Sequence, residues 1–432
     1  MSRCKREALA RGTIDVAWLG RALGRDVESA AFRAQDKMGG MSGVIKYLDV
    51  AFVDGTTQHL VVKLAPQQLP ESRVFLGVAR EAFFYAELAP ALGDYVGNAA
   101  YTWGDLASGD MLLLLHEHED AVPAGLFYGR GNPNNWKLSE SSIVTLGTAV
   151  GSPTAVECSA ACFSIYAKLH AAHWNDRVLL RSKMWLRGSD WLLLHEGRSA
   201  WEACQAMAAG GWASAKATIA AGTGTLRWDP HVIACLDASL AQVSWDAFIA
   251  QAAARPFALV QGDAHPHNAL WVSGAAPAGA AGAASSPPES DSAADDVVKE
   301  RPPGGAVGRR LVLIDFEMIG VGSPAQELGQ FMISHTAPAL RRASERELIA
   351  DYHAEIAALL RAKGLDAEAE DFTLDACWAE YVAGGAARWM WFVAAMVTWG
   401  LPPKAHQFFH DQLAGFLRDH VPDPAKCEMP RV

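Results

Sequence analysis

The sequence contains no uninterrupted apolar run of about 18 residues, the length that a helix needs to cross a lipid bilayer. It also contains no C-x-x-C pair. Its seven cysteines are scattered among apolar segments, which is typical of free thiols in a reducing compartment. The first residues are charged, and no apolar signal-peptide core follows them. We therefore expect a cytoplasmic protein with no membrane span.

Positive charge is also scarce. The chain has 37 Lys and Arg against 48 Asp and Glu, and its net charge of −11 argues against nucleic acid as a partner. No internal repeat is visible. With 432 residues, of which 50% are hydrophobic and 20% charged, the chain has enough apolar surface for the cores of two lobes. The composition leaves the oligomeric state open.

Two short runs carry the residues that point to chemistry. Residues 262–268 place Asp263 and Asn268 five positions apart, the D-x-x-x-x-N spacing of a kinase catalytic loop. Residues 313–317 place Asp315 at the end of an apolar run, where a kinase carries its metal-binding carboxylate. Strands are predicted at 257–260, 269–272 and 311–314, around both runs. Phosphoryl transfer needs one carboxylate for the acceptor's proton, and an amide and a second carboxylate for Mg²⁺, so this set predicts a phosphotransferase.

The stretches LVQGDAHPHNALWV and LVLIDFEMIGVGSP resemble the aminoglycoside phosphotransferase and choline kinase superfamily, and within it the ecdysteroid-kinase-like small-molecule kinases. The resemblance implies an α+β, two-lobed protein-kinase-like fold, with a small, mainly antiparallel-sheet N-lobe and a larger, mainly helical C-lobe. It also implies ATP and Mg²⁺ in the cleft, and transfer of the γ-phosphoryl group to a hydroxyl of a small molecule. By position, Asp263 matches the catalytic base, Asn268 a metal-binding amide and Asp315 the metal-binding carboxylate.

The upstream chain fits the same template. Kinase N-lobes use a lysine on a strand to hold the α- and β-phosphates, and a helix glutamate to orient that lysine. Lys63 lies in an apolar strand-like run, residues 59–64, and Glu81 lies in a helical stretch, residues 80–89. We predict that these two residues pair at the nucleotide. The alternative is that Lys63 is a solvated strand-end lysine and Glu81 a solvated helix charge.

Two further segments are predicted to contact the nucleotide. The glycine cluster at 37–43 precedes a strand, so Gly40, Ser42 and Gly43 are candidates for a phosphate loop, although hairpins also use glycine turns. The apolar strand at 111–115 leads into a His/Glu/Asp run that contains Glu119. The resemblance assigns this run to the hinge that binds adenine. Residues 116–118, a His-Glu-His run, separate the strand from the expected Glu-Asp pair. The hinge register therefore stays open, and a metal site is the alternative interpretation.

The resemblance divides the chain into an N-lobe of residues 1–118 and a C-lobe of residues 119–432. Residues 274–308 consist mainly of Gly, Ala, Ser and Pro, and such a segment cannot bury enough apolar surface to offset its ordering entropy. We expect a disordered insertion at the tip of a hairpin, where extra length costs little.

Supporting residues are also predicted. The family usually places an Asp about a dozen residues after the metal-binding carboxylate to brace the catalytic loop, and Glu327 stands there instead. His170, on a half-buried helical face, is expected to be a packed, hydrogen-bonded core residue. The C-terminal third is helical by pattern, and some of its tryptophans are expected to line the acceptor pocket.

Two other functions stay open. One is a catalytically silent pseudokinase-like protein that binds nucleotide. The altered hinge and Glu327 depart from the family pattern and keep this alternative open. The other is a metal-dependent hydrolase built on Asp263, His265, His267 and Asp315, which would need neither Lys63 nor the glycine cluster. The acceptor is predicted to be a small hydroxylated molecule; a sterol-like alcohol, an amino alcohol, a sugar and an antibiotic all remain possible.

Overall fold

The computed structural model describes residues 9–33, 43–66, 70–118, 120–190, 197–272, 310–368 and 370–432. Three of the predicted nucleotide-binding residues, Gly40, Ser42 and Glu119, lie outside the described residues, and so does the segment 274–308.

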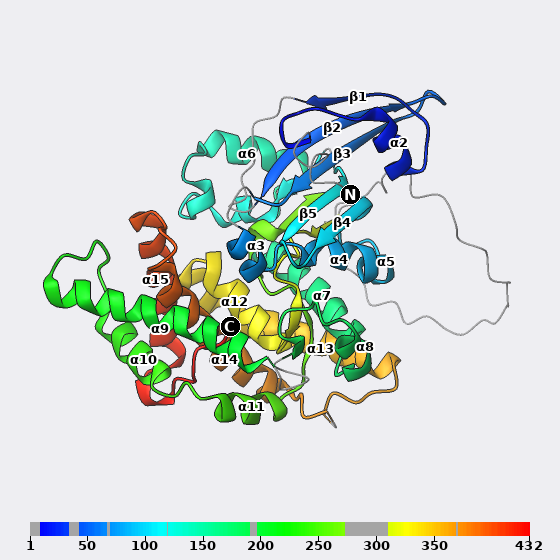
Figure 1. Ribbon diagram of the computed structural model, residues 1–432. Coiled ribbons are helices and arrows are strands. Elements are labelled where there is room, and N and C mark those ends of the chain that lie inside the picture. The colour runs from blue at the N-terminus through cyan, green and yellow to red at the C-terminus, as the bar shows by residue number, and fades with distance from the viewer. Residues whose placement is uncertain are drawn as a thin grey trace.

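A five-stranded antiparallel sheet forms the first part of the molecule, at the top of the view in Figure 1. The strand order is β1-β2-β3-β5-β4, and every neighbouring pair is antiparallel. The strands are β1 (Val27–Arg33), β2 (Val44–Phe52), β3 (Thr57–Leu64), β4 (Ala99–Asp105) and β5 (Asp110–His116). The helices in this part of the chain are α2 (Val16–Leu23), α3 (Pro70–Leu76), α4 (Arg80–Glu87) and the short α5 (Ala89–Leu92).

The alternation of side chains along β3 decides to which face of the sheet Lys63 points. Leu60, Val62 and Leu64 are fully buried and share one core cluster with residues of α2 and β2. Successive side chains of a strand point to opposite faces, so Lys63 is directed to the other face of the sheet. The helix α4 packs against β4 and β5 on that face, which brings a helix side chain within reach of the lysine.

The rest of the chain is mainly helical and lies mostly below the sheet in Figure 1, except α6, which lies beside it. Its α-helices are α6 (Glu140–Ala149), α7 (Ala155–Ala172), α8 (Arg177–Ser182), α9 (Arg198–Ala221), α10 (Pro230–Leu240), α11 (Trp245–Ala253), α12 (Pro324–His335), α13 (Pro338–Ala362), α14 (Leu374–Met396) and α15 (Pro403–His420). The predicted α+β class, with a small antiparallel-sheet part and a larger, mainly helical part, is confirmed. The boundary between residues 118 and 119 stays a prediction.

Two small sheets sit between the large sheet and the helices. One pairs β7 (Ala258–Val260) with β10 (Gly320–Gly322), and the other has the order β6-β8-β9, from β6 (Val122–Pro123), β8 (Ala269–Val272) and β9 (Arg310–Leu313). The strands predicted at 257–260, 269–272 and 311–314 are therefore confirmed within one residue at each end. The pair β8–β9 is antiparallel, as the predicted hairpin requires.

Helices α12 and α14 approach each other closely at two glycines. A Cβ atom on Gly329 would lie 2.7 Å from the Cα atom of Gly385 and would collide with the carbonyl oxygen of Tyr381. Glycine is required at this crossing because no other residue lets two helix backbones come so near. The contact fixes α14 against α12, and both helices carry residues of the candidate site.

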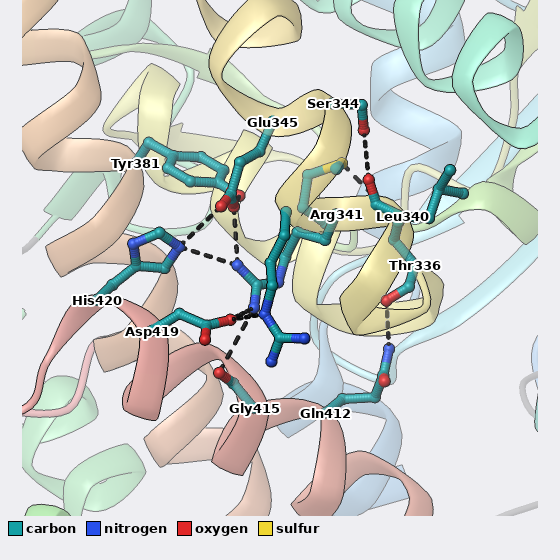
Figure 2. A network of polar contacts seen from close by, with 12 residues as sticks. Thr336, Leu340, Arg341, Ser344, Glu345, Tyr381, Gln412, Gly415, Asp419 and His420 are labelled. Atoms are coloured by element: carbon teal, nitrogen blue, oxygen red, sulfur yellow. Dashed lines mark hydrogen bonds and ion pairs between the residues drawn. The ribbon is translucent and has the colours of Figure 1, made fainter.

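A buried polar network holds α13, α14 and α15 together (Figure 2). The carboxylate of Glu345 accepts hydrogen bonds from Arg341 Nη1 at 2.9 Å and from the Tyr381 hydroxyl at 2.8 Å, and its other oxygen lies 3.0 Å from His420 Nε2. Arg341 also pairs with Asp419 on α15. A buried ion network that is fully hydrogen-bonded specifies one arrangement of its elements, so α14 has a defined position.

Among the described residues, no single helix meets the length and hydropathy that a membrane span requires, and only the bent pair α10 and α11 does so in combination. The cytoplasmic location stays a prediction.

Candidate functional site

Lys63 lies between two carboxylates from distant parts of the chain. Its Nζ atom is 2.6 Å from Glu81 Oε2 on α4 and 2.9 Å from Asp315 Oδ1, beyond the end of β9. Burial alone lowers the pKa of Lys63, but the attraction of Asp315 and Glu81 outweighs it and holds that pKa well above its ordinary value. The lysine is therefore a fixed buried cation. The alternative in which Lys63 and Glu81 are solvated is wrong, since neither side chain is more than 7% exposed.

Asp315 has an unusual backbone conformation that its neighbour anchors. Its φ of +61° lies in the left-handed region, which few non-glycine residues adopt and in which Asp is more common than most. The next residue, Phe316, is fully buried and stacks on Phe84 of α4 with ring centroids 3.9 Å apart. Its backbone N–H donates to Glu81 Oε1 at 3.3 Å. The packing of Phe316 thus holds the Asp315 carboxylate beside Lys63.

The predicted catalytic loop is joined to the Asp315 turn by hydrogen bonds. Asn268, at the end of η4 (Pro266–Asn268), donates from Nδ2 to the Asp263 carbonyl at 2.9 Å and to Asp263 Oδ2 at 3.2 Å. The Asn268 carbonyl accepts from the Ile314 N–H at 2.9 Å. Asp263, Asn268 and Asp315 are therefore brought into one site by the β8–β9 pairing.

The Asp263 carboxylate is partly buried among polar groups, with 34% of the side chain exposed. Its Oδ2 is 3.5 Å from His265 Nε2. Burial alone raises the pKa of Asp263, but His265 and Arg388 outweigh it, so that pKa stands below its ordinary value. Asp263 is ionised at neutral pH and able to accept a hydrogen bond or a proton from a hydroxyl group.

Glu327 braces the catalytic loop from α12. Its Oε1 accepts the Gly262 N–H at 2.7 Å, and its Oε2 accepts the Gln261 N–H at 3.2 Å. Gly262 has a φ of +82°, and a Cβ there would collide with the Met318 carbonyl, so this tight segment needs its glycine. The longer glutamate side chain reaches both N–H groups, and it thus supports the loop although the family pattern has an Asp.

His170 completes this support from α7. Its Nε2 is 2.9 Å from Glu327 Oε2, and its Nδ1 is 2.8 Å from the Tyr352 hydroxyl on α13. The prediction of a packed, hydrogen-bonded core histidine is confirmed. The imidazole links the loop brace to α13 instead of facing the reacting groups.

Glu317 belongs to the site but has no role in the sequence analysis. Its Oε2 atom is buried and has no hydrogen-bond partner among the described residues. Burial, followed by the charge of Asp315, raises the pKa of Glu317 to about 8. The only signal in the sequence is its place two residues after Asp315.

Three further residues were also missed because their local sequence is unremarkable. Gln261 accepts from the Tyr166 hydroxyl at 2.7 Å and donates to the Ile314 carbonyl at 2.6 Å, which ties the loop to β9. Gln330 and Arg388 both donate to the Gly262 carbonyl, at 3.3 and 3.1 Å. No periodicity or spacing marks these positions, since their role depends on how α12 and α14 pack.

Of the predicted phosphate loop, only Gly43 is among the described residues. Its φ is +93°, and a Cβ there would lie 2.9 Å from the Leu64 carbonyl oxygen and 3.8 Å from Lys63 Cε. The glycine thus lets the start of β2 pass close to the lysine. The roles of Gly40, Ser42 and Glu119 stay predictions.

His265 lies beside Asp263, whereas the tryptophans have mainly packing contacts. No cluster of three or more His, Cys, Asp or Glu side chains in the described part of the chain is arranged to hold a metal ion. This argues against the hydrolase centre that includes His265 and His267. Trp389 and Trp391 are 4% exposed, and their indole N–H groups donate to the carbonyls of Gln330 and Cys204, as expected of core residues.

Comparisons with known proteins agree with the predicted resemblance. A model of the ecdysteroid kinase-like family matches residues 305–365, which contain Asp315 and Glu327. The family resemblance stated from the sequence is confirmed over this segment. No curated protein matches.

Similar solved structures are small-molecule kinases by their titles. A microcompartment-associated aminopropanol kinase is 12% identical with a TM-score of 0.46, over 95% of this chain and 99% of that one. An ethanolamine kinase of Plasmodium vivax is 9% identical with a TM-score of 0.40, and the match covers 91% of this chain and 82% of that one. A macrolide 2'-phosphotransferase of Brachybacterium faecium is 14% identical with a TM-score of 0.40, and the match covers 92% of this chain and 96% of that one.

Proposed function

We propose that this protein is an ATP- and Mg²⁺-dependent phosphotransferase that transfers the γ-phosphoryl group of ATP to a hydroxyl of a small molecule. The observation that carries the proposal is the contact of Lys63 with Asp315, two residues 252 positions apart, at the turn that is hydrogen-bonded to the Asp263–Asn268 loop. A strand lysine paired with a helix glutamate, beside two aspartates and an asparagine, is the set that phosphoryl transfer from a nucleotide needs.

On the nucleotide side, Lys63 would hold the α- and β-phosphates, and Glu81 would fix the direction of the lysine. Gly43, together with Gly40 and Ser42, would contribute backbone N–H groups to the phosphates. Glu119 would belong to the hinge that binds adenine. Lys63 is already oriented by two ion pairs, so little side-chain freedom is lost when nucleotide binds.

The residues around Asp315 fit a magnesium ion. Mg²⁺ prefers oxygen ligands, and the amide of Asn268 and the carboxylate of Asp315 supply them. The buried, unpartnered Oε2 of Glu317 is a third oxygen that a cation would satisfy. When bound, the ion would neutralise the negative charge of the phosphates. We place Asn268 and Asp315 as the main ligands, with Glu317 as a further candidate.

Asp263 would orient the acceptor hydroxyl and accept its proton. Its low pKa suits a carboxylate that must stay ionised until the hydroxyl binds. The hydrogen bonds from Asn268 and the brace from Glu327 keep the carboxylate in place. The rate would come mainly from positioning of the groups and neutralisation of charge.

A single experiment tests the proposal against the alternatives. The protein is incubated with ATP and Mg²⁺ and a panel of hydroxylated metabolites, and phosphate adducts are sought by mass spectrometry. Transfer that needs ATP, Mg²⁺ and Asp263 supports the kinase. MgATP binding without transfer to any acceptor would favour the pseudokinase, and ATP-independent, metal-dependent hydrolysis would favour the hydrolase.

A further inference from the structure

Arg388, on α14, has hydrogen-bonding capacity that the protein does not use. The side chain is 1% exposed, and its Nε and Nη2 atoms donate to Gln330 Oε1 at 3.3 Å and to the Gly262 carbonyl at 3.1 Å. Its Nη1 atom is buried and has no hydrogen-bond partner in the described part of the chain. An unpaired, buried N–H of a cation costs several kcal/mol unless a ligand satisfies it.

Arg187 is attached through its backbone to the small sheet that precedes Asp263. Its backbone is held at β10, with its N–H donating to the Ile319 carbonyl at 3.1 Å and its carbonyl accepting from the Val321 N–H at 2.8 Å. β10 pairs with β7, the strand that leads into Asp263. The side chain of Arg187 is half-buried, and within the described residues it forms no hydrogen bond or ion pair.

The two guanidinium groups are close enough for the charge of Arg388 to act on Arg187, and both feel the charge of Asp263. Burial, followed by the charge of Arg388, holds the pKa of Arg187 well below its ordinary value. Burial lowers the pKa of Arg388 to about 10, although Asp263 opposes that shift. Arg388 is a cation at neutral pH, since its pKa of about 10 lies well above 7, and the guanidinium of an arginine is in general not deprotonated in proteins. Asp263 is the shared anion nearby, and it forms no ion pair with either arginine in the described structure.

We propose that Arg187 and Arg388 bind an anionic group, a carboxylate or a phosphate monoester, on the acceptor whose hydroxyl is presented to Asp263. The inference rests on the proposed kinase function and narrows its substrate to hydroxylated organic anions. Guanidinium groups match the planar and tetrahedral oxygens of these anions with paired hydrogen bonds. A cationic acceptor such as an amino alcohol would instead be repelled by two desolvated positive charges.

The first test measures anion binding directly, with inorganic sulfate as the probe. Sulfate is titrated at constant ionic strength, with and without saturating MgADP, and binding is followed by calorimetry and by the shift in Tm. We expect binding that persists with MgADP, since the nucleotide phosphates are held elsewhere. Arg187→Gln should weaken this binding at least about tenfold, which corresponds to the loss of one charge-assisted contact. The exposed Arg361→Gln, at the end of α13, is the matched control and should bind sulfate like the wild type.

The second test compares acceptors in matched pairs: a hydroxy acid with its amide, and a sugar phosphate with the free sugar. The wild type should prefer the anionic member by at least about tenfold in kcat/KM, and Arg187→Gln should lose that preference through a higher KM. The matched pair in which the anionic member is preferred also tells whether the anionic group of the acceptor is a carboxylate or a phosphate. Arg187 carries the test because Arg388 also contacts the catalytic loop, and Arg388→Gln serves as the second variant.

Two outcomes would overturn the inference. One is a wild-type preference for neutral or cationic acceptors, which would leave the kinase function standing. The other is sulfate binding that is absent, or that is equal in the wild type, Arg187→Gln and Arg388→Gln. If MgATP neither binds nor reacts, the proposed function fails, and the sulfate titration without nucleotide still decides whether the arginines form an anion site.

Discussion

Removing the Glu327 carboxylate tests how much the catalytic loop depends on its brace. In Glu327→Ala, three buried donors lose their acceptor: the Gln261 N–H, the Gly262 N–H and His170 Nε2, which lie 3.2, 2.7 and 2.9 Å from the carboxylate oxygens. At about 1–3 kcal/mol for each unsatisfied donor, and with losses that are not additive, we expect a destabilisation of about 3–6 kcal/mol. That is a large part of the roughly 5–15 kcal/mol that stabilises a typical domain.

A milder variant separates positioning from folding. Glu327→Gln keeps the volume and one acceptor oxygen but turns an amide N–H₂ toward the donors, so we expect a loss of about 1.5–3 kcal/mol. The loop that carries Asp263 would be misplaced, and kcat should fall at least about tenfold, while the Kd of MgATP stays within about threefold because Lys63 is on another element.

The assay is urea unfolding for stability, with kcat and calorimetric MgATP binding on the same preparations. The exposed Glu347→Ala on α13 is the matched control and should shift the free energy of unfolding by less than about 0.5 kcal/mol. The reasoning is refuted if Glu327→Ala unfolds within about 1 kcal/mol of the wild type, or if Glu327→Gln keeps full kcat.

Three more outcomes are expected. Asp263→Asn should lower kcat at least about a hundredfold with near-normal MgATP affinity, and equal turnover would remove Asp263 from the mechanism. Asp315→Ala should abolish Mg²⁺-dependent nucleotide binding in calorimetry, and unchanged affinity would place the metal elsewhere. Replacing residues 274–308 by an Asn-Gly turn should join β8 directly to β9, which are already paired in antiparallel register, and preserve kcat. Stability should hold or rise by about 0.6 kcal/mol for each halving of loop length, and unfolding of the shortened chain would show that the segment packs on the protein.

The residues that could be predicted from the sequence are those whose chemistry requires a fixed residue type at a fixed spacing. Asp263 and Asn268 stand five positions apart on one loop, Lys63 lies within a recognisable apolar strand, and Asp315 follows another. The structure brings all of them together. The predicted pairing of Lys63 with Glu81 is present in the structure.

Other features depended on contacts that no local pattern records. The helix predicted over residues 80–89 ends at Glu87, because Pro90 lies in the first turn of a separate short helix, α5 (Ala89–Leu92). β9 ends at Leu313, before the left-handed Asp315. Arg388 lies in a run that predicts only a buried helix, and its place beside Gly262 follows from the crossing of α14 and α12.

That crossing also limits how this scaffold can be re-engineered. Gly329 and Gly385 leave no room for a side chain, so the spacing of the two helix axes is set by their backbones. A substitution at either glycine would displace Glu327 and Arg388 together, and loop alignment and acceptor choice would change in one step. A library that seeks new acceptors should therefore hold both glycines constant and vary Arg187, which is attached to a different element and can be exchanged without moving the helix pair.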